Sequence, residues 1–136
     1  MPYKFEKLDV WQMSLAYIDS IYQLADKLPE SEKFNLMSQI TRAATSISLN
    51  IAEGSTGQSN PEQSRFLGMA IRSLIETVAC QRIILRRKYI NDLVFMEKLD
   101  LQSQELAKRL HSFRKALGQK NKQLSEEASM YTADEI

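Results

Sequence analysis

The side chains that most often carry enzyme chemistry are scarce in this sequence. His111 is its one histidine and Cys80 its one cysteine. We find no nucleophile elbow and no cluster of metal-ligating residues. A single thiol also excludes a disulfide framework and a paired-cysteine metal site. We therefore predict that the protein is not an enzyme, needs no metal or cofactor, buries Cys80 and exposes His111.

The segment Gly54-Ser55-Thr56-Gly57 shares with phosphate-binding loops only its glycines. No lysine follows at the required spacing, and the preceding residues have a helical pattern where such a loop should follow a strand. A phosphate-binding function for this loop is therefore not favoured.

Polar residues recur at spacings of three and four in two adjacent segments, so each set shares one helix face. The first set is Gln39, Arg42, Ser46, Asn50 and Glu53, and the second is Arg65, Arg72 and Glu76, with Gly68 on the same line between the two arginines. An antiparallel hairpin would pair Glu53 with Arg65, Asn50 with Gly68, Ser46 with Arg72, and Arg42 with Glu76. The small residues Ala43, Ser46 and Gly68 would let the two backbones approach. One interpretation is a ligand or catalytic site that uses Glu53 with an arginine. The favoured one is an ion-paired seam that fixes helix register or forms a subunit contact.

Charge is unevenly distributed along the chain. Residues 1–64 carry a net charge of −3, residues 65–122 carry +8 and residues 123–136 carry −4. The candidates for phosphate contact are Arg82, Arg86, Arg87, Lys88, Lys108, Arg109, Arg114 and Lys115. A basic surface on the second half can attract polyanions, and the acidic end can screen it. The alternative is that these cations solvate helix faces and complement helix C-termini. Aromatic residues among them are sparse, which gives base stacking little support.

These residues need helices to position them. The first should run from near Lys7 to before Pro29. It carries two apolar lines, one through Leu8, Trp11, Leu15, Ile18, Tyr22 and Ala25, the other through Val10, Tyr17, Ile21, Leu24 and Leu28. Two apolar lines exceed the need of one core, which indicates an oligomer.

Three further helices follow. Ser31 can cap the second, whose buried stripe runs from Phe34 to Ile51 and which should end at Gly54 in a left-handed conformation. The third should begin with Asn60 as its cap and Pro61 in its first turn, and reach about Tyr89. The fourth should span residues 93–117 and stop at Gly118.

The sequence therefore predicts an all-α fold, an antiparallel up-down-up-down four-helix bundle. We expect the bundle to occupy residues 1–118, and residues 119–136 to be a polar, flexible C-terminal tail in which Met130, Tyr131 and Ile136 could dock elsewhere. The N-terminus has no signal-peptide pattern, and no apolar run is long enough to span a membrane. We expect a cytoplasmic protein with no membrane association.

Several of these segments together resemble a known family. They are the motif Asn50-Ile51-Ala52-Glu53-Gly54, the preceding segment QITRAATSI, the turn LPESEKFNL, and FLGMAIRSLIET in the third helix. The chain is thus similar, over about residues 5–117, to the four-helix-bundle proteins associated with intervening sequences in 23S ribosomal RNA genes (S23 ribosomal protein-like). A small Gly-Ser pair is common there where this chain has Arg72-Ser73, so Arg72 can give the seam a different partner.

The resemblance implies a four-helix bundle and a homopentameric ring. A more distant similarity, to the accessory variability protein of diversity-generating retroelements, implies a basic surface that binds nucleic acid and a reverse transcriptase. The resulting hypothesis is a non-enzymatic, homo-oligomeric scaffold that binds RNA or DNA. The alternative is an adaptor whose basic surface binds an acidic protein partner, with no role in nucleic-acid binding.

Overall fold

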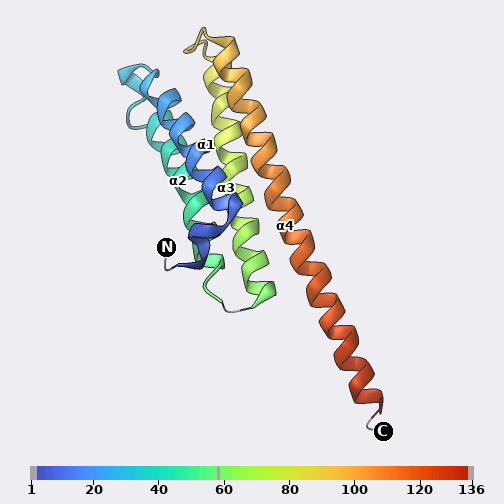
Figure 1. The fold of residues 1–136 in the computed structure, drawn as a ribbon. Helices are drawn as coiled ribbons and strands as arrows, with labels where there is room; N and C mark the ends of the chain where they lie inside the picture. The colour runs from blue at the N-terminus through green and yellow to red at the C-terminus, as the bar shows by residue number, and fades with distance from the viewer. Residues whose placement is uncertain (1–2, 58, 135–136) are drawn as a thin grey trace.

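Four α-helices pack side by side in the described part of the chain. The computed structural model describes residues 3–57 and 59–134, with side chains as far as Gln119, and contains no strand within these ranges. The helices are α1 (Asp9–Asp26), α2 (Leu36–Gly54), α3 (Asn60–Arg86) and α4 (Leu93–Asp134), with short 3-10 helices η1 (Lys4–Lys7) and η2 (Glu30–Glu32). Successive α-helices run in opposite directions (Figure 1). The all-α, four-helix prediction is confirmed.

One apolar core holds the bundle together. The predicted stripes of α2, α3 and α4 supply much of it, through residues such as Ile40, Ile47, Leu74 and Leu106. Cys80 is buried, as predicted. The two apolar lines of α1 have different fates. Val10, Tyr17, Ile21, Leu24 and Leu28 are buried, whereas the other line is half-buried along most of its length and leaves Tyr22 48% exposed.

The start of α2 differs from the prediction. Ser31 does not cap a helix, because it lies inside η2 and α2 begins only at Leu36. The Glu32 carboxylate instead accepts hydrogen bonds from the Leu36 backbone N–H at 3.4 Å and the Asn35 amide at 2.8 Å. The predicted burial of Phe34 is also wrong: its side chain is 90% exposed, since it precedes the helix whose stripe it was expected to extend.

Gly54 is the last residue of α2, but the space it leaves, and not the predicted left-handed conformation, accounts for a glycine there. Its backbone is not left-handed, and among the described glycines only Gly57, in the loop, has a positive φ (87°). A Cβ on Gly54 would lie 2.8 Å from the Cβ of Phe66, so Gly54 permits a close approach of α2 to α3. The cap of α3 is Ser59 rather than Asn60, because its Oγ accepts from the Glu62 N–H at 3.2 Å. Pro61 lies in the first turn, as predicted.

The later helix ends also differ. The third helix ends at Arg86 rather than near Tyr89, and Lys88 takes a positive φ of 58° in the connection to α4. The predicted stop at Gly118 is wrong, because α4 continues to Asp134. Its 42 residues give a length of about 63 Å, against about 40 Å for the 27 residues of α3. The last part of α4 therefore projects beyond the other helices (Figure 1).

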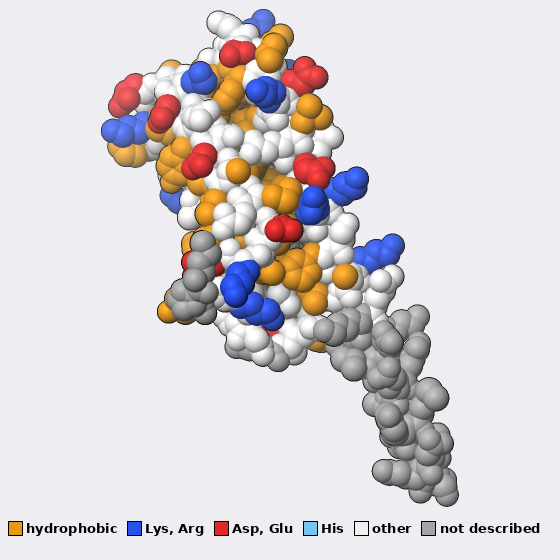
Figure 2. Space-filling view, viewed as in Figure 1, with side chains coloured by type: hydrophobic (Ala, Val, Ile, Leu, Met, Phe, Trp, Pro, Cys, Tyr) orange, Lys and Arg blue, Asp and Glu red, His pale blue; other side chains and the backbone are white. Residues whose placement is uncertain are grey.

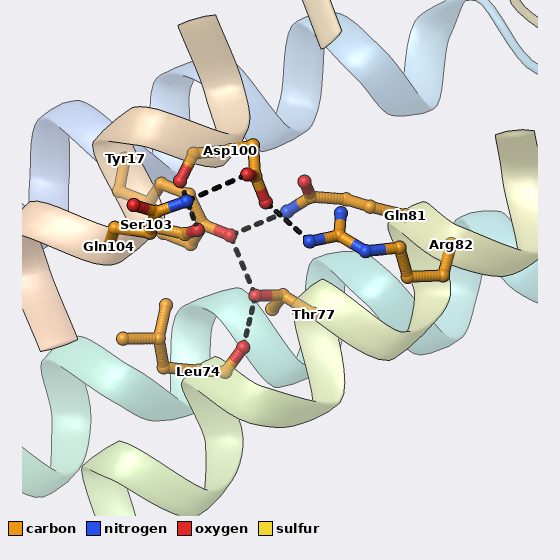
Figure 3. Close-up of polar contacts among 8 residues, drawn as sticks. All are labelled: Tyr17, Leu74, Thr77, Gln81, Arg82, Asp100, Ser103 and Gln104. Carbon is orange, nitrogen blue, oxygen red and sulfur yellow. Dashed lines mark hydrogen bonds and ion pairs between the residues drawn. The ribbon is translucent and has the colours of Figure 1, made fainter. Parts of the chain in front are cut away.

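A directed chain of hydrogen bonds crosses the core between α1 and α3 (Figure 3). The Thr77 hydroxyl donates to the Leu74 carbonyl at 2.6 Å, so it must accept from the Tyr17 hydroxyl, 2.8 Å away. The Gln81 amide then donates to Tyr17 at 2.7 Å. Burial, opposed by these hydrogen bonds, raises the pKa of Tyr17 to about 12. The Gln81 Oε1 atom is buried without a hydrogen-bond partner.

We predict that Tyr17→Phe lowers the free energy of unfolding by about 1–3 kcal/mol, because it leaves buried donors and acceptors of Thr77 and Gln81 unpaired. Urea denaturation measures the change, and Tyr22→Phe, at a half-exposed tyrosine, is the matched control. Because folding raises the pKa of Tyr17, its protonated hydroxyl favours the folded state fully below pH 10, and this stabilisation is lost as pH rises toward 12. The difference between the wild type and Tyr17→Phe should therefore narrow above pH 10. Equal effects of the two variants would contradict the assignment.

We predict opposite effects of alanine at two glycines. Gly54→Ala should destabilise by about 1–3 kcal/mol, because the added methyl meets Phe66. Gly118→Ala should stabilise by about 0.5–1 kcal/mol, since a Cβ there meets nothing within 4 Å and the position is inside a helix. Thermal unfolding of both variants is the measurement. A destabilised Gly118→Ala would mean that α4 does not continue through this residue.

Candidate nucleic-acid interface and polar helix face

The predicted seam residues lie together on the outer side of the α2–α3 hairpin. Arg42, Glu53, Arg65, Arg72 and Glu76 are exposed, and Ser46 and Asn50 are half-buried. The hairpin register is close to the prediction, because the Ser73 hydroxyl donates to the Ser46 hydroxyl at 3.0 Å, one position from the expected pair with Arg72. Asn50 donates within α2, to the Ser46 carbonyl at 2.9 Å. The seven residues thus form one polar helix face.

The predicted ion pairs across the hairpin do not form. Arg65 pairs with Glu62 at 2.6 Å, and Arg42 donates to the Ser38 hydroxyl at 3.0 Å. Partners three or four positions away on the same helix are nearer than those on the neighbouring one, and water screens the exposed charges. The Arg65 guanidinium lowers the pKa of Glu62. Glu62 likewise raises the pKa of Arg65, to which Glu53 contributes only a minor part.

Gly68 faces α4 rather than Asn50. A Cβ there would lie 3.1 Å from Arg114 Nη1, so the missing side chain makes room for a guanidinium. Arg114 is half-buried, and its Nε donates to the Ser64 hydroxyl at 3.3 Å. Arg114 is therefore placed to pack α4 against α3.

The remaining basic candidates fall into two groups. Arg86, Arg87 and Lys88 lie at the end of α3 and in its connection to α4. Lys108 and Lys115 lie on α4 with His111 between them, and their spacing puts all three on one exposed face, here called the α4 basic face. Lys108 lies fifteen positions beyond Leu93, about 22 Å along α4, so one monomer does not unite the two groups.

Two of the predicted arginines have acidic partners. Arg82 contacts Asp100 at 2.7 Å, and Arg109 contacts Glu105 at 3.4 Å. Lys108 and Lys115 make no ion pair with any residue whose side chain is described. On the molecular face in Figure 2, blue cationic groups alternate with red acidic ones and with apolar groups. On this face the +8 balance of residues 65–122 therefore does not produce a single basic field.

A polar cluster joins the α1–α2 connection to the α3–α4 connection at one end of the bundle. The Tyr89 hydroxyl donates to the Glu32 carboxylate at 2.8 Å, and the Arg87 guanidinium lies 5.7 Å from the centre of the Tyr89 ring. The hydrogen bond from Tyr89, followed by that from Asn35, lowers the pKa of Glu32. Tyr89 also contributes most to the raised pKa of Arg87. Arg87 is thus engaged in joining the connections.

Sequence reasoning missed a groove along the outer side of α2. Its main hollow, of 770 Å³, is lined by residues that include Tyr3, Phe5, Leu49, Ala52 and Glu53. A second hollow shares Leu49 and continues past Thr45 to Arg42, where a third adjoins it. We define the α2 groove by Ser38, Arg42, Thr45, Leu49, Ala52 and Glu53. The only sequence signal was Leu49, an apolar residue outside the buried stripe, which is 61% exposed.

The described residues hold neither a metal-ligand cluster nor a membrane-spanning helix. No group of three or more His, Cys, Asp or Glu side chains there could hold a metal ion. No helix in that part of the chain is long and apolar enough to cross a membrane.

A family model and a solved structure both relate this chain to one family. A family model described as 23S rRNA-intervening sequence protein matches residues 6–112. A crystal structure of a protein of unknown function, from the S23 ribosomal protein family of Bacteroides thetaiotaomicron, is similar with a TM-score of 0.71 and 31% identity. The similarity covers 78% of this chain and 98% of that one. No curated protein matches this chain.

We predict that Tyr89→Phe raises the pKa of Glu32 toward its ordinary value, because the first cause of the lowered pKa is removed. A carboxylate whose pKa is lowered by folding stabilises the fold at pH values above its unfolded-state pKa. This stabilisation is lost as pH falls through its folded-state pKa. Tyr89→Phe should therefore be less stable than the wild type at neutral pH, with the difference vanishing in acid. Carbon-13 NMR of the Glu32 carboxyl and urea unfolding against pH measure both effects. An unchanged Glu32 titration would refute the role of Tyr89, and Tyr22→Phe is the control.

Proposed function

Since the chain belongs to the family of 23S rRNA-intervening sequence proteins, we propose that it is a non-enzymatic, homo-oligomeric four-helix bundle that binds nucleic acid through basic side chains repeated around the assembly. The observation that carries this proposal is the α4 basic face. Lys108, His111 and Lys115 are exposed in line on a rigid helix, and the two lysines have no acidic partner among the described side chains. Such cations can contact successive phosphates.

Self-association would compensate for the small size of this face. One copy offers few cations on this face, but repetition in an assembly multiplies the phosphate contacts without a new interaction type. Exposed apolar side chains support association. They include Leu49 on α2 and Ile75 and Ile83 on α3, each at least 48% exposed. We propose a ring of five copies as the assembly.

The second candidate is an adaptor that binds an acidic protein. The observation that favours it is the mixture of charges and apolar groups on the surface, with Arg82 and Arg109 already paired to carboxylates. Protein interfaces commonly combine apolar anchors with such a polar rim. Affinity for nucleic acid distinguishes the candidates.

We predict that the full chain has a solution mass of five subunits by light scattering, and that the mass rises when generic single-stranded RNA is added at low salt. The logarithm of the affinity should fall linearly with that of the salt concentration, by about 0.7 per phosphate contact. The double variant Lys108→Gln, Lys115→Gln should reduce this slope without changing the mass. A monomer, or no RNA binding at low salt, would refute the respective part of the proposal.

The control for this experiment removes the same charge elsewhere. Lys7 and Lys33 are exposed outside the α4 basic face. Changing both to Gln should leave the salt slope nearly unchanged. Equal losses in the two double variants would assign RNA binding to overall charge. Binding of acidic proteins but not RNA would favour the adaptor.

A further inference from the structure

The α2 groove has the shape and chemistry to accept a helix. It follows α2 from Ser38 to Glu53, and small or β-branched residues such as Thr45 and Ser46 line its middle. Next to Leu49 the hollow is apolar, between Ala52 and the aromatic rings of Tyr3 and Phe5. Small residues permit close helix approach, and exposed apolar side chains provide anchors. Glu53 and Arg42 mark the two ends with opposite charges.

The end of α4 is a helix that leaves its own bundle. After Gly118 it continues for sixteen residues to Asp134, beyond the other helices (Figure 1). The buried line through Leu110 and Leu117 continues in sequence through Leu124, Ala128 and Tyr131, at helical spacing. Isolated helices of about this length are marginal in water, and glycine at the root weakens this one further. A stable extension therefore requires a surface on which to pack.

We infer that the α4 extension, residues 119–134, binds in the α2 groove of a second copy of this chain. The lengths match, because nineteen residues of α2 span about 28 Å and sixteen of the extension about 24 Å. The family model ends at residue 112, so the extension lies outside the matched region, whereas the groove lies inside it. The inference rests on the self-association in the proposed function, and names the segment and surface that meet.

Charge fixes the direction of the extension in the groove. Lys120 and Lys122 are near its root, whereas Asp134 is at its far end. Glu53 and Arg42 are eleven residues apart, about 16 Å along α2, and Lys120 and Asp134, which fall on the same side of the helix as Leu124, are fourteen apart, about 21 Å. Only one direction brings both pairs of opposite charges together. The extension root then lies at the Glu53 end of the groove.

The first test measures association of the full chain by analytical ultracentrifugation. Leu49→Asp should weaken self-association at least tenfold, because it removes the exposed apolar anchor of the groove. Leu101→Asp, at a similarly exposed leucine on α4, is the matched control and should have little effect. Circular dichroism confirms folding of both. If the wild type self-associates and Leu49→Asp does not weaken that self-association, the inference is overturned. A monomeric wild type would refute the proposed assembly as well.

The second test identifies the occupant of the groove. Glu53→Lys should weaken association, and combining it with Lys120→Glu and Lys122→Glu should restore it. In parallel, Leu49→Cys and Leu124→Cys copies, co-expressed with different tags, should form a mixed disulfide under mild oxidation. Leu101→Cys replaces Leu49→Cys in the control, which should not cross-link. Absence of both charge rescue and the mixed disulfide would assign the groove to a different occupant and overturn the inference, even if RNA binding persists.

Discussion

The Tyr17 hydroxyl is the constraint that determines which face of α1 points into the bundle. Apolar burial is non-directional, and α1 has two apolar lines that could each face a core. The chain from Gln81 through Tyr17 and Thr77 to the Leu74 carbonyl is directional, because each hydroxyl both accepts and donates. It commits the Tyr17 line to the interior (Figure 3). The other line is consequently only half-buried along most of its length, and its Tyr22 lies at the surface beside the α2 groove.

The sequence was sufficient to predict the elements and most of the core, because apolar spacing reports directly which helix face is buried. Pairing between helices was harder to predict. The register from Ser46 to Ser73 was one position from that expected, but a helix turns by about 100° per residue, so a shift of one position directs different side chains across the contact. Arg65 also had a nearer partner, Glu62, on its own helix.

The glycines show why identical residues can have different roles. Gly54 allows Phe66 to approach, Gly68 makes room for Arg114, and Gly57 adopts a positive φ. A sequence indicates that glycine is helpful at a position, but it does not show whether space or backbone conformation is the reason. Gly118 was expected to end α4 through its backbone conformation, yet the helix continues through it. Similarly, net charge by segment could not reveal that Arg82 and Arg109 are paired or that Arg114 is half-buried.

A segment of one copy that enters a groove on the next makes a head-to-tail contact, because the two surfaces differ. Such contacts give a closed ring if the rotation between copies closes, and an open filament otherwise. The rotation would be set by the angle at which α4 leaves its bundle, and thus by the packing of Arg114 over Gly68 just before the extension. The α4 basic face lies on the same stretch of helix. Each junction between copies would therefore carry one set of Lys108, His111 and Lys115, so the spacing of copies would also set the spacing of phosphate contacts.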